Sequence, residues 1–144
     1  MQKNLEILGD IQYTQDEIDF ALDMQKANGK PLIGIDGKIR PLRETLESPG
    51  GGSTDVGDVS YNVPVVSLAA TTAPKGVPWH SWSVVASSGM SIGHKGMLHA
   101  AKALGMSMID IYKDKKLREE IKKEFDERIG DYNYCLLYTS PSPR

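Results

Sequence analysis

Val63-Pro64-Val65-Val66-Ser67-Leu68-Ala69-Ala70 decides the expected fold, because it is the clearest candidate for a buried strand in this chain. Its residues are apolar almost without interruption. A strand that is covered by helices on both faces of a parallel sheet shows this pattern. Amphipathic helical patterns lie before and after the run. We therefore expect an α/β fold.

Upstream, a helix is predicted to begin after Thr14. The sequence Thr14-Gln15-Asp16-Glu17 is a capping box, in which Glu17 can reach back to the amide of the cap residue. Asn28-Gly29 is typical of a left-handed helix end. Between these two signals the residues at helical spacing are Ile18, Ala21, Leu22 and Gln25.

Downstream, a long helical pattern starts at Ser91. Its predicted core face consists of Met97, Leu98, Ala101, Leu104, Met108 and Ile111. A further helix is predicted between a cap at Asp114 and Gly130, with charged residues spaced i,i+4 on its solvent face. The apolar stripe of that helix consists of Leu117, Ile121, Phe125 and Ile129.

Composition limits the class of protein. The chain has 144 residues, of which 40% are hydrophobic and 25% charged, and its formal net charge is −2. This slightly acidic balance argues against a nucleic-acid partner, which requires a basic face. No apolar run approaches the roughly 20 residues of a membrane span. The start of the chain has no apolar signal core, which favours a cytoplasmic location.

The last ten residues, 135–144, break with the charged helical pattern before them. They resemble a translated reading frame of a transposase sequencing adapter, and a natural terminal tail is the alternative. We expect residues 135–144 to be non-native and residues 1–134 to form a partial catalytic domain. The one cysteine, Cys135, excludes an internal disulfide and a cysteine-based metal cluster.

A glycine-rich polar segment, Gly50-Gly51-Gly52-Ser53-Thr54-Asp55, precedes the apolar run. Glycine lets backbone approach a ligand closely, because it has no Cβ. Neither a Gly-Lys-Ser/Thr step nor a Gly-x-Gly-x-x-Gly pattern follows, so the segment is not a nucleotide loop. A plain linker is the alternative interpretation.

Trp79-His80-Ser81-Trp82 is the second candidate site. The tryptophans could form the apolar walls of a pocket around His80, or they could be core anchors. His94 and His99 are five residues apart and cannot form the i,i+4 metal pair of a helix. Asp55 and Asp58 with one histidine fall short of a complete metal site.

These segments together resemble one family. Gly52–Ser60, Trp79–Trp82, Gly93–Met97 and Ala100–Leu104 are similar to the C-terminal part of the M20 metallopeptidase/amidohydrolase family. The similarity is greatest to the branch that contains aminobenzoyl-glutamate utilisation protein B. The resemblance implies the C-terminal portion of a two-metal hydrolase catalytic domain of the α/β class, with the lid and dimerisation domain absent. It also implies two divalent metal ions, zinc or manganese.

The resemblance assigns roles to particular residues. His80 would be a metal ligand, and Asp55 would contact the His80 side chain and orient it. The substrate-binding residues would be Gly51, Gly52, Ser53 and Thr54. His94 matches a position typical of the branch, without an assigned role. The family's early His-x-Asp ligands and its Glu-Glu pair have no counterpart before His80.

We therefore expect a fragment of an amidohydrolase, inactive in isolation, whose parent cleaves the amide of an N-acyl amino acid or an aminobenzoyl-glutamate-like substrate. The parent would be a homo-oligomer or would pair with a related subunit. Two alternatives stay open. One is a non-enzymatic module that binds a small ligand or peptide through the glycine-rich segment. The other is a degenerate subunit that scaffolds an active hydrolase.

Overall fold

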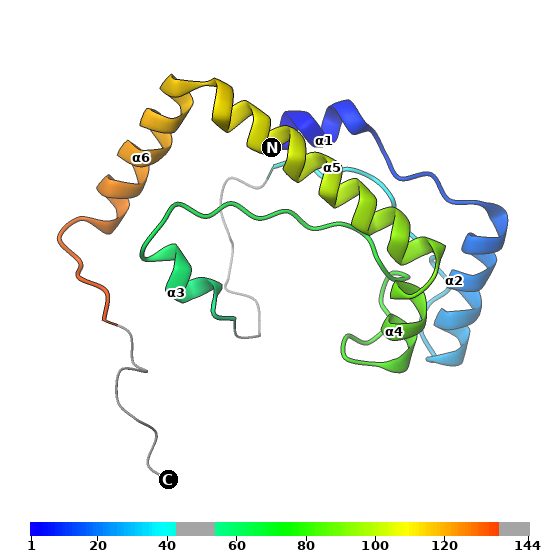
Figure 1. Ribbon diagram of the computed structural model, residues 1–144. Helices are drawn as coiled ribbons and strands as arrows, with labels where there is room; N and C mark the ends of the chain where they lie inside the picture. The colour runs from blue at the N-terminus through cyan, green and yellow to red at the C-terminus, as the bar shows by residue number, and fades with distance from the viewer. Residues whose placement is uncertain (43–53, 136–144) are drawn as a thin grey trace, which may run out of the picture. The chain divides into compact units, whose positions relative to one another are not determined.

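The computed structural model describes residues 1–42 and 54–135, and helices are the regular elements in these two ranges (Figure 1). Two compact units make up the described chain: residues 1–42 with 68–109, and residues 54–67 with 110–135. The helices are α1 (Gln2–Leu8), α2 (Gln15–Ala27), α3 (Val56–Ser60), α4 (Trp82–Ser88), α5 (Ser91–Lys113) and α6 (Lys115–Ile129).

The expected α/β fold is wrong, because no strand occurs in the described ranges. The apolar run from Val63 to Ala70 has irregular backbone, and Val63, Val65 and Val66 are exposed. A strand requires a hydrogen-bonded neighbour about 4.8 Å away. No second strand supplies this neighbour in the part of the chain that the structure describes. The residues that the structure describes therefore form a helical fold, not a portion of an α/β catalytic domain.

In the first unit, α2 begins and ends as its sequence predicts. The Thr14 hydroxyl accepts a hydrogen bond from the Glu17 amide at 3.3 Å, and the Glu17 carboxylate accepts one from the Thr14 amide at 2.7 Å. At the other end, Gly29 has a φ of 61°, and the Lys30 amide donates to the Gln25 carbonyl at 2.9 Å. This bond from the residue after a left-handed glycine is typical of a Schellman motif. The capping-box prediction is confirmed.

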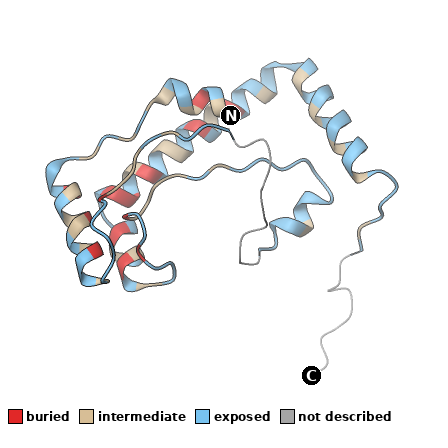
Figure 2. Cartoon of the chain, turned by 180° about the vertical axis from the view of Figure 1, so that it is seen from behind, coloured by how far each residue is buried: buried red, intermediate tan, exposed pale blue. Residues whose placement is uncertain are grey.

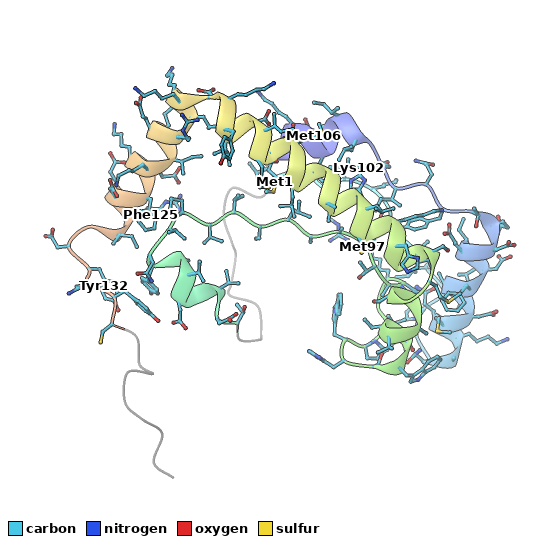
Figure 3. All side chains as sticks on the ribbon, in the orientation of Figure 1. Met1, Met97, Lys102, Met106, Phe125 and Tyr132 are labelled. Atoms are coloured by element: carbon cyan, nitrogen blue, oxygen red, sulfur yellow. The ribbon has the colours of Figure 1, made fainter. Side chains whose placement is uncertain are left out.

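Helix α5 confirms the predicted helix but not its predicted core face. Met97, Leu98 and Met108 are exposed, and Figure 3 labels Met97 on this helix. The buried positions of α5 are Ile92, Gly93, Gly96, Ala103 and Ser107. The helix therefore packs through a stripe of mostly small side chains, with Ile92 as its large apolar member, rather than through the predicted face.

Two contacts show how closely this stripe is approached. A Cβ on Gly96 would lie 2.2 Å from the carbonyl oxygen of Thr71, so the loop backbone lies directly against the helix. The Asn4 amide of α1 donates to the Ser107 hydroxyl at 3.1 Å. Small residues are required on this face because neighbouring segments occupy the space where a side chain would extend.

Hydrogen bonds carry much of the packing in the first unit. Its buried apolar side chains are small in number and size, whereas the buried polar ones lie on α1, α2, α4 and α5 (Figure 2). The buried apolar residues are Ala21, Pro74, Val77, Ile92 and Ala103. The buried polar residues are Asn4, Glu17, Gln25, Ser83, Ser87 and Ser107.

In the second unit, α3 and α6 contain no buried residue. The side chain of Asp114 accepts a hydrogen bond from the Leu117 amide at 3.0 Å, which confirms the predicted cap of α6. Ion pairs spaced i,i+4 follow along the helix, including Lys115 with Glu119 at 3.5 Å. Phe125 belongs to its apolar stripe and is half-buried (Figure 3).

Three tyrosines form an aromatic cluster in the second unit. The rings of Tyr61 and Tyr134 stack with centroids 5.1 Å apart, and Tyr132 lies 5.2 Å from Tyr61. The Tyr134 hydroxyl donates a hydrogen bond to the Asp58 carboxylate, and this bond, with burial and the Asp58 charge, raises the pKa of Tyr134 to about 12. Asp58 therefore connects α3 to the segment that follows α6.

None of the helices in the described part of the chain combines the length and apolarity that crossing a bilayer requires.

Candidate functional site

The residues that the resemblance assigns to the site belong to both units of the chain, and some of them lie outside the described residues. Gly51, Gly52 and Ser53 lie outside the described residues. Thr54 and Asp55 directly precede α3 in the second unit, where the Thr54 hydroxyl accepts a hydrogen bond from the Val56 amide at 3.3 Å. His80 belongs to the first unit. The support of His80 by Asp55 therefore stays a prediction.

His80 occupies a tight turn directly before α4. Its φ is 59°, in the left-handed region that an L-residue other than glycine adopts at a cost of about 1–2 kcal/mol. The Ser81 hydroxyl donates to the Pro78 carbonyl at 2.6 Å and so closes the turn around His80. The Ser81 carbonyl then accepts the Val84 amide at 3.1 Å and opens α4. Local bonds thus hold His80 in a backbone conformation that is itself unfavourable.

The side chain of Gln25 fixes the loop before this turn. Gln25 is 0% exposed, and its amide nitrogen donates to the carbonyls of Gly34 at 2.9 Å and Lys75 at 2.8 Å. Its oxygen accepts the amides of Ile33 and Gly34, both at 2.9 Å. All four hydrogen-bonding positions of the side chain are therefore used. One helical residue holds two loops together.

Helix α2 also holds the segment after the turn. The Asn28 amide donates to the Ser83 hydroxyl at 2.7 Å, and the Ser87 hydroxyl donates to the Ser83 carbonyl at 2.7 Å. Lys75 and Ser83 flank His80 in sequence, so α2 anchors the chain on both sides of the histidine. In the sequence, the sign of this anchor is Gln25, because it is a polar residue at a position of the apolar stripe predicted for α2.

Trp79 and Trp82 are 72% and 58% exposed, and His80 is exposed between them. Because so much of both side chains is exposed, the two tryptophans are not core anchors. An exposed imidazole can bind a metal or transfer a proton, and indole rings beside it can contact an apolar ligand group. The turn presents one titratable group and two aromatic surfaces to solvent.

The described residues do not form a metal centre by themselves. Within 1–42 and 54–135, no group of three or more histidine, cysteine, aspartate or glutamate side chains lies close enough together to hold an ion. Two bridged metals require more ligands than His80 can supply. A metal bound at His80 would need ligands from outside these ranges.

A second polar cluster connects α2 to α5. The Lys95 ammonium lies 2.6 Å from the Glu17 carboxylate and 5.6 Å from the centre of the Tyr13 ring. Burial raises the pKa of Glu17, but hydrogen bonds from Lys95, Ser91 and Thr14, with the Lys95 charge, outweigh burial and lower it to about 2. Burial, followed by the charges of Glu17 and Asp36, raises the pKa of Tyr13 to about 12. The paired charges give this cluster a structural role.

Comparison with known proteins adds to this geometry. The chain is similar to one subunit of the p-aminobenzoyl-glutamate hydrolase of Escherichia coli (strain K12). The two sequences are 39% identical over 94 residues, which are 63% of this chain and 20% of the relative. The chain thus spans about a fifth of the length of this relative.

This similarity supports a relationship to that hydrolase, in agreement with the resemblance of the glycine-rich and His80 segments. No protein-family model matches the chain. No solved structure matches it either.

Proposed function

We propose that this chain forms part of the active site of a metal-dependent amidohydrolase of the M20 type. The substrate class is the amide of an N-acyl amino acid or an aminobenzoyl-glutamate-like compound. One observation carries the proposal: an anchored turn presents His80 to solvent in a chain that is 39% identical over 94 residues to part of a p-aminobenzoyl-glutamate hydrolase.

In this proposal His80 supplies one ligand to a pair of zinc or manganese ions, which polarise the amide carbonyl and activate water when bound. Asp55 orients the His80 ring, and Gly51, Gly52, Ser53 and Thr54 contact the substrate. The remaining ligands come from outside the described residues. The 144-residue chain alone is then inactive, because one imidazole does not hold two metals.

The relative is named as a subunit, which supports an assembly in which the active protein pairs with a related chain or with itself. A non-catalytic subunit that scaffolds an active partner is the second candidate. The name of the relative, which describes it as one subunit of a hydrolase, supports this alternative.

A chimera of the Escherichia coli relative tests the proposal. The segment of the relative that aligns with this chain is replaced by this chain's own residues, including His80, and release of p-aminobenzoate is measured. We expect hydrolysis, and we expect His80→Ala to lower kcat/KM by more than about a hundredfold with loss of bound metal. His99→Gln, at a half-buried position of α5, is the matched histidine control.

Hydrolysis and metal content that survive His80→Ala would contradict the ligand role of His80. A chimera that neither hydrolyses the substrate nor binds metal would favour the scaffolding subunit.

A further inference from the structure

Two methionines and a histidine lie along one side of the first turns of α5. Met90 directly precedes the helix, and His94 and Met97 follow it by four and seven residues. The His94 amide donates to the Met90 carbonyl at 3.0 Å, so the helical backbone already includes Met90. Residues three and four apart on a helix are neighbours, with Cβ atoms about 5–6 Å apart. His94 therefore lies between the two methionines and next to each of them.

All three of these side chains are open to solvent. Met90 is 45% exposed, Met97 is 58% exposed, and His94 is exposed as well. The His94 imidazole has no hydrogen-bond or ion-pair partner within the two described ranges. Two thioether sulfurs and an imidazole nitrogen are therefore available to one ligand.

The backbone that carries the three donors is fixed by packing elsewhere on the helix. Gly93 and Gly96 are buried. A Cβ on Gly93 would collide with the carbonyl oxygen of Ser88 at the end of α4, and one on Gly96 with that of Thr71. These close contacts hold the first turns of α5 and leave the donors uncovered. A ligand at the donors thus does not have to order the backbone.

The chemistry of the surroundings indicates which cation suits these donors. From residue 59 to residue 109 the sequence contains no aspartate or glutamate, so this segment offers no carboxylate to a hard cation. The ammonium of Lys95, the residue after His94, is paired with the Glu17 carboxylate at 2.6 Å. Thioether sulfur selects Cu(I), and imidazole also binds copper. The donor set therefore favours a soft monovalent cation.

We propose that Met90, His94 and Met97 form a binding site for Cu(I). Cu(I) has a filled d shell and imposes no fixed geometry, so the flexible methionine side chains can close on it from both sides of the imidazole. This set differs from the groups of histidine, cysteine and carboxylate side chains that hold zinc or manganese, of which none with three members occurs within residues 1–42 and 54–135. The site does not include His80 and does not depend on the proposed hydrolase function.

Nuclear magnetic resonance of the full chain with isotope-labelled methionine methyl groups tests the site. Cys135→Ser is used as the background, because the exposed thiol is itself a soft ligand. The probe is Ag(I), a diamagnetic analogue of Cu(I) that is stable in air. Of the six methionine methyl signals, we expect those of Met90 and Met97 to shift and to saturate at one equivalent, together with the imidazole signals of His94. Shifts confined to other methionines, or shifts that do not saturate, overturn the site.

Methionine variants identify the two sulfur ligands. Met90→Leu and Met97→Leu nearly conserve volume and remove the sulfur. Each should lower the affinity for Cu(I) at least about tenfold, measured without oxygen in competition with the chromophoric chelator bicinchoninate. Met108→Leu is the control, because Met108 is 62% exposed on the same helix and has no histidine three or four residues away. It should leave the affinity unchanged. Unchanged affinity in both Met90→Leu and Met97→Leu overturns the proposal, and circular dichroism verifies the helices.

Histidine variants separate this site from the turn before α4. His94→Gln should also lower the affinity for Cu(I) at least about tenfold, whereas the matched control His99→Gln should leave it unchanged. His80→Ala should leave it unchanged as well, because His80 is not a ligand of this site. Equal affinity of wild type and His94→Gln, or loss of Cu(I) binding in His80→Ala, overturns the site.

Zinc tests the predicted selectivity. Because thioether sulfur is a poor ligand for zinc, we expect zinc to bind at least about tenfold more weakly than Cu(I) at these three residues. Equal affinity for the two ions contradicts a soft-cation site.

Discussion

The carboxylate of Glu17 accepts a hydrogen bond from the Lys95 ammonium at 2.6 Å while it also accepts the Thr14 amide at 2.7 Å. One side chain thus completes the cap of α2 and connects this helix to α5. The Glu17 side chain is buried, whereas Lys95 is partly exposed. Removal of this carboxylate affects a local bond and a long-range bond together.

Glu17→Gln keeps the shape of the side chain and removes its charge. We expect a loss of about 1–3 kcal/mol in the free energy of unfolding, because a charge-assisted bond is lost and Lys95 loses its partner. Urea unfolding followed by circular dichroism measures this change. Glu119→Gln removes an exposed ion pair of α6 and should change stability by less than about 0.5 kcal/mol. Equal effects of the two variants would refute the special role of Glu17.

The lowered pKa of Glu17 predicts how stability depends on pH. The folded-state pKa is about 2 and the unfolded value is 4.5, so the unfolded chain binds more protons between these values. The stability from Glu17 is therefore present above its unfolded pKa and is lost as pH falls toward the folded one. Urea midpoints measured at pH 6, 4 and 3 should fall more steeply in the wild type than in Glu17→Gln. Parallel curves would rule out this linkage.

Gly96→Ala tests the close approach of the loop to α5. The new Cβ would lie 2.2 Å from the Thr71 carbonyl oxygen and 2.9 Å from a methyl carbon of Thr72. We expect a destabilisation of about 1–3 kcal/mol, because backbone has to move. Gly105→Ala is the matched control in the same helix, where no atom lies within 4 Å of the new Cβ. It should stabilise the protein by up to about 1 kcal/mol. Effects of the same sign would contradict this packing.

Gln25→Met removes the side chain that bonds to both loops. We expect a loss of about 2–4 kcal/mol in the free energy of unfolding, because the Gly34 amide and the Lys75 carbonyl lose the partner that Gln25 supplies. Trypsin should cleave faster after Lys75, since the Lys75 carbonyl is no longer held. Gln15→Met changes an exposed glutamine of the same helix. It should leave the free energy of unfolding and the rate of cleavage after Lys75 nearly unchanged. Unaltered cleavage after Lys75 in Gln25→Met would argue against the anchor.

The left-handed backbone of His80 predicts an order among its variants. His80→Gly should be more stable than His80→Ala by about 1 kcal/mol, because glycine adopts a φ of 59° without strain. At His94, inside α5, the order should reverse, with alanine more stable by about 1 kcal/mol. Thermal unfolding of the four variants measures both differences. The same order at both positions would show that the turn is not strained.

The sequence predicts the helices whose ends are set by local bonds. Thr14 with Glu17, the left-handed Gly29 and the cap at Asp114 each depend on residues within one turn, so their patterns are sufficient. The face of α5 depends on distant segments instead. Periodicity identifies the helix, but the close approach of Thr71 to Gly96 selects the small-residue side over the side that carries Met97.

The strand prediction fails for a related reason. An apolar run such as Val63–Ala70 becomes a strand only when another strand bonds to it, and this condition lies outside the run itself. At the candidate site, the sequence identifies His80 and its two tryptophans but neither the left-handed turn nor the anchoring by Gln25. The left-handed turn depends on a bond specific to it, between Ser81 and Pro78. The anchoring depends on bonds between Gln25 and residues distant in sequence, such as Lys75.

Gln25 bonds only to main-chain atoms of the loops, at Ile33, Gly34 and Lys75. Every amino acid supplies a carbonyl at position 75, so the side chain there is free to change without loss of the anchor. The same holds for the exposed residues of the turn that the anchor does not contact. Substitutions at position 75 and at the exposed positions of the turn therefore change the chemistry of this loop without changing its path.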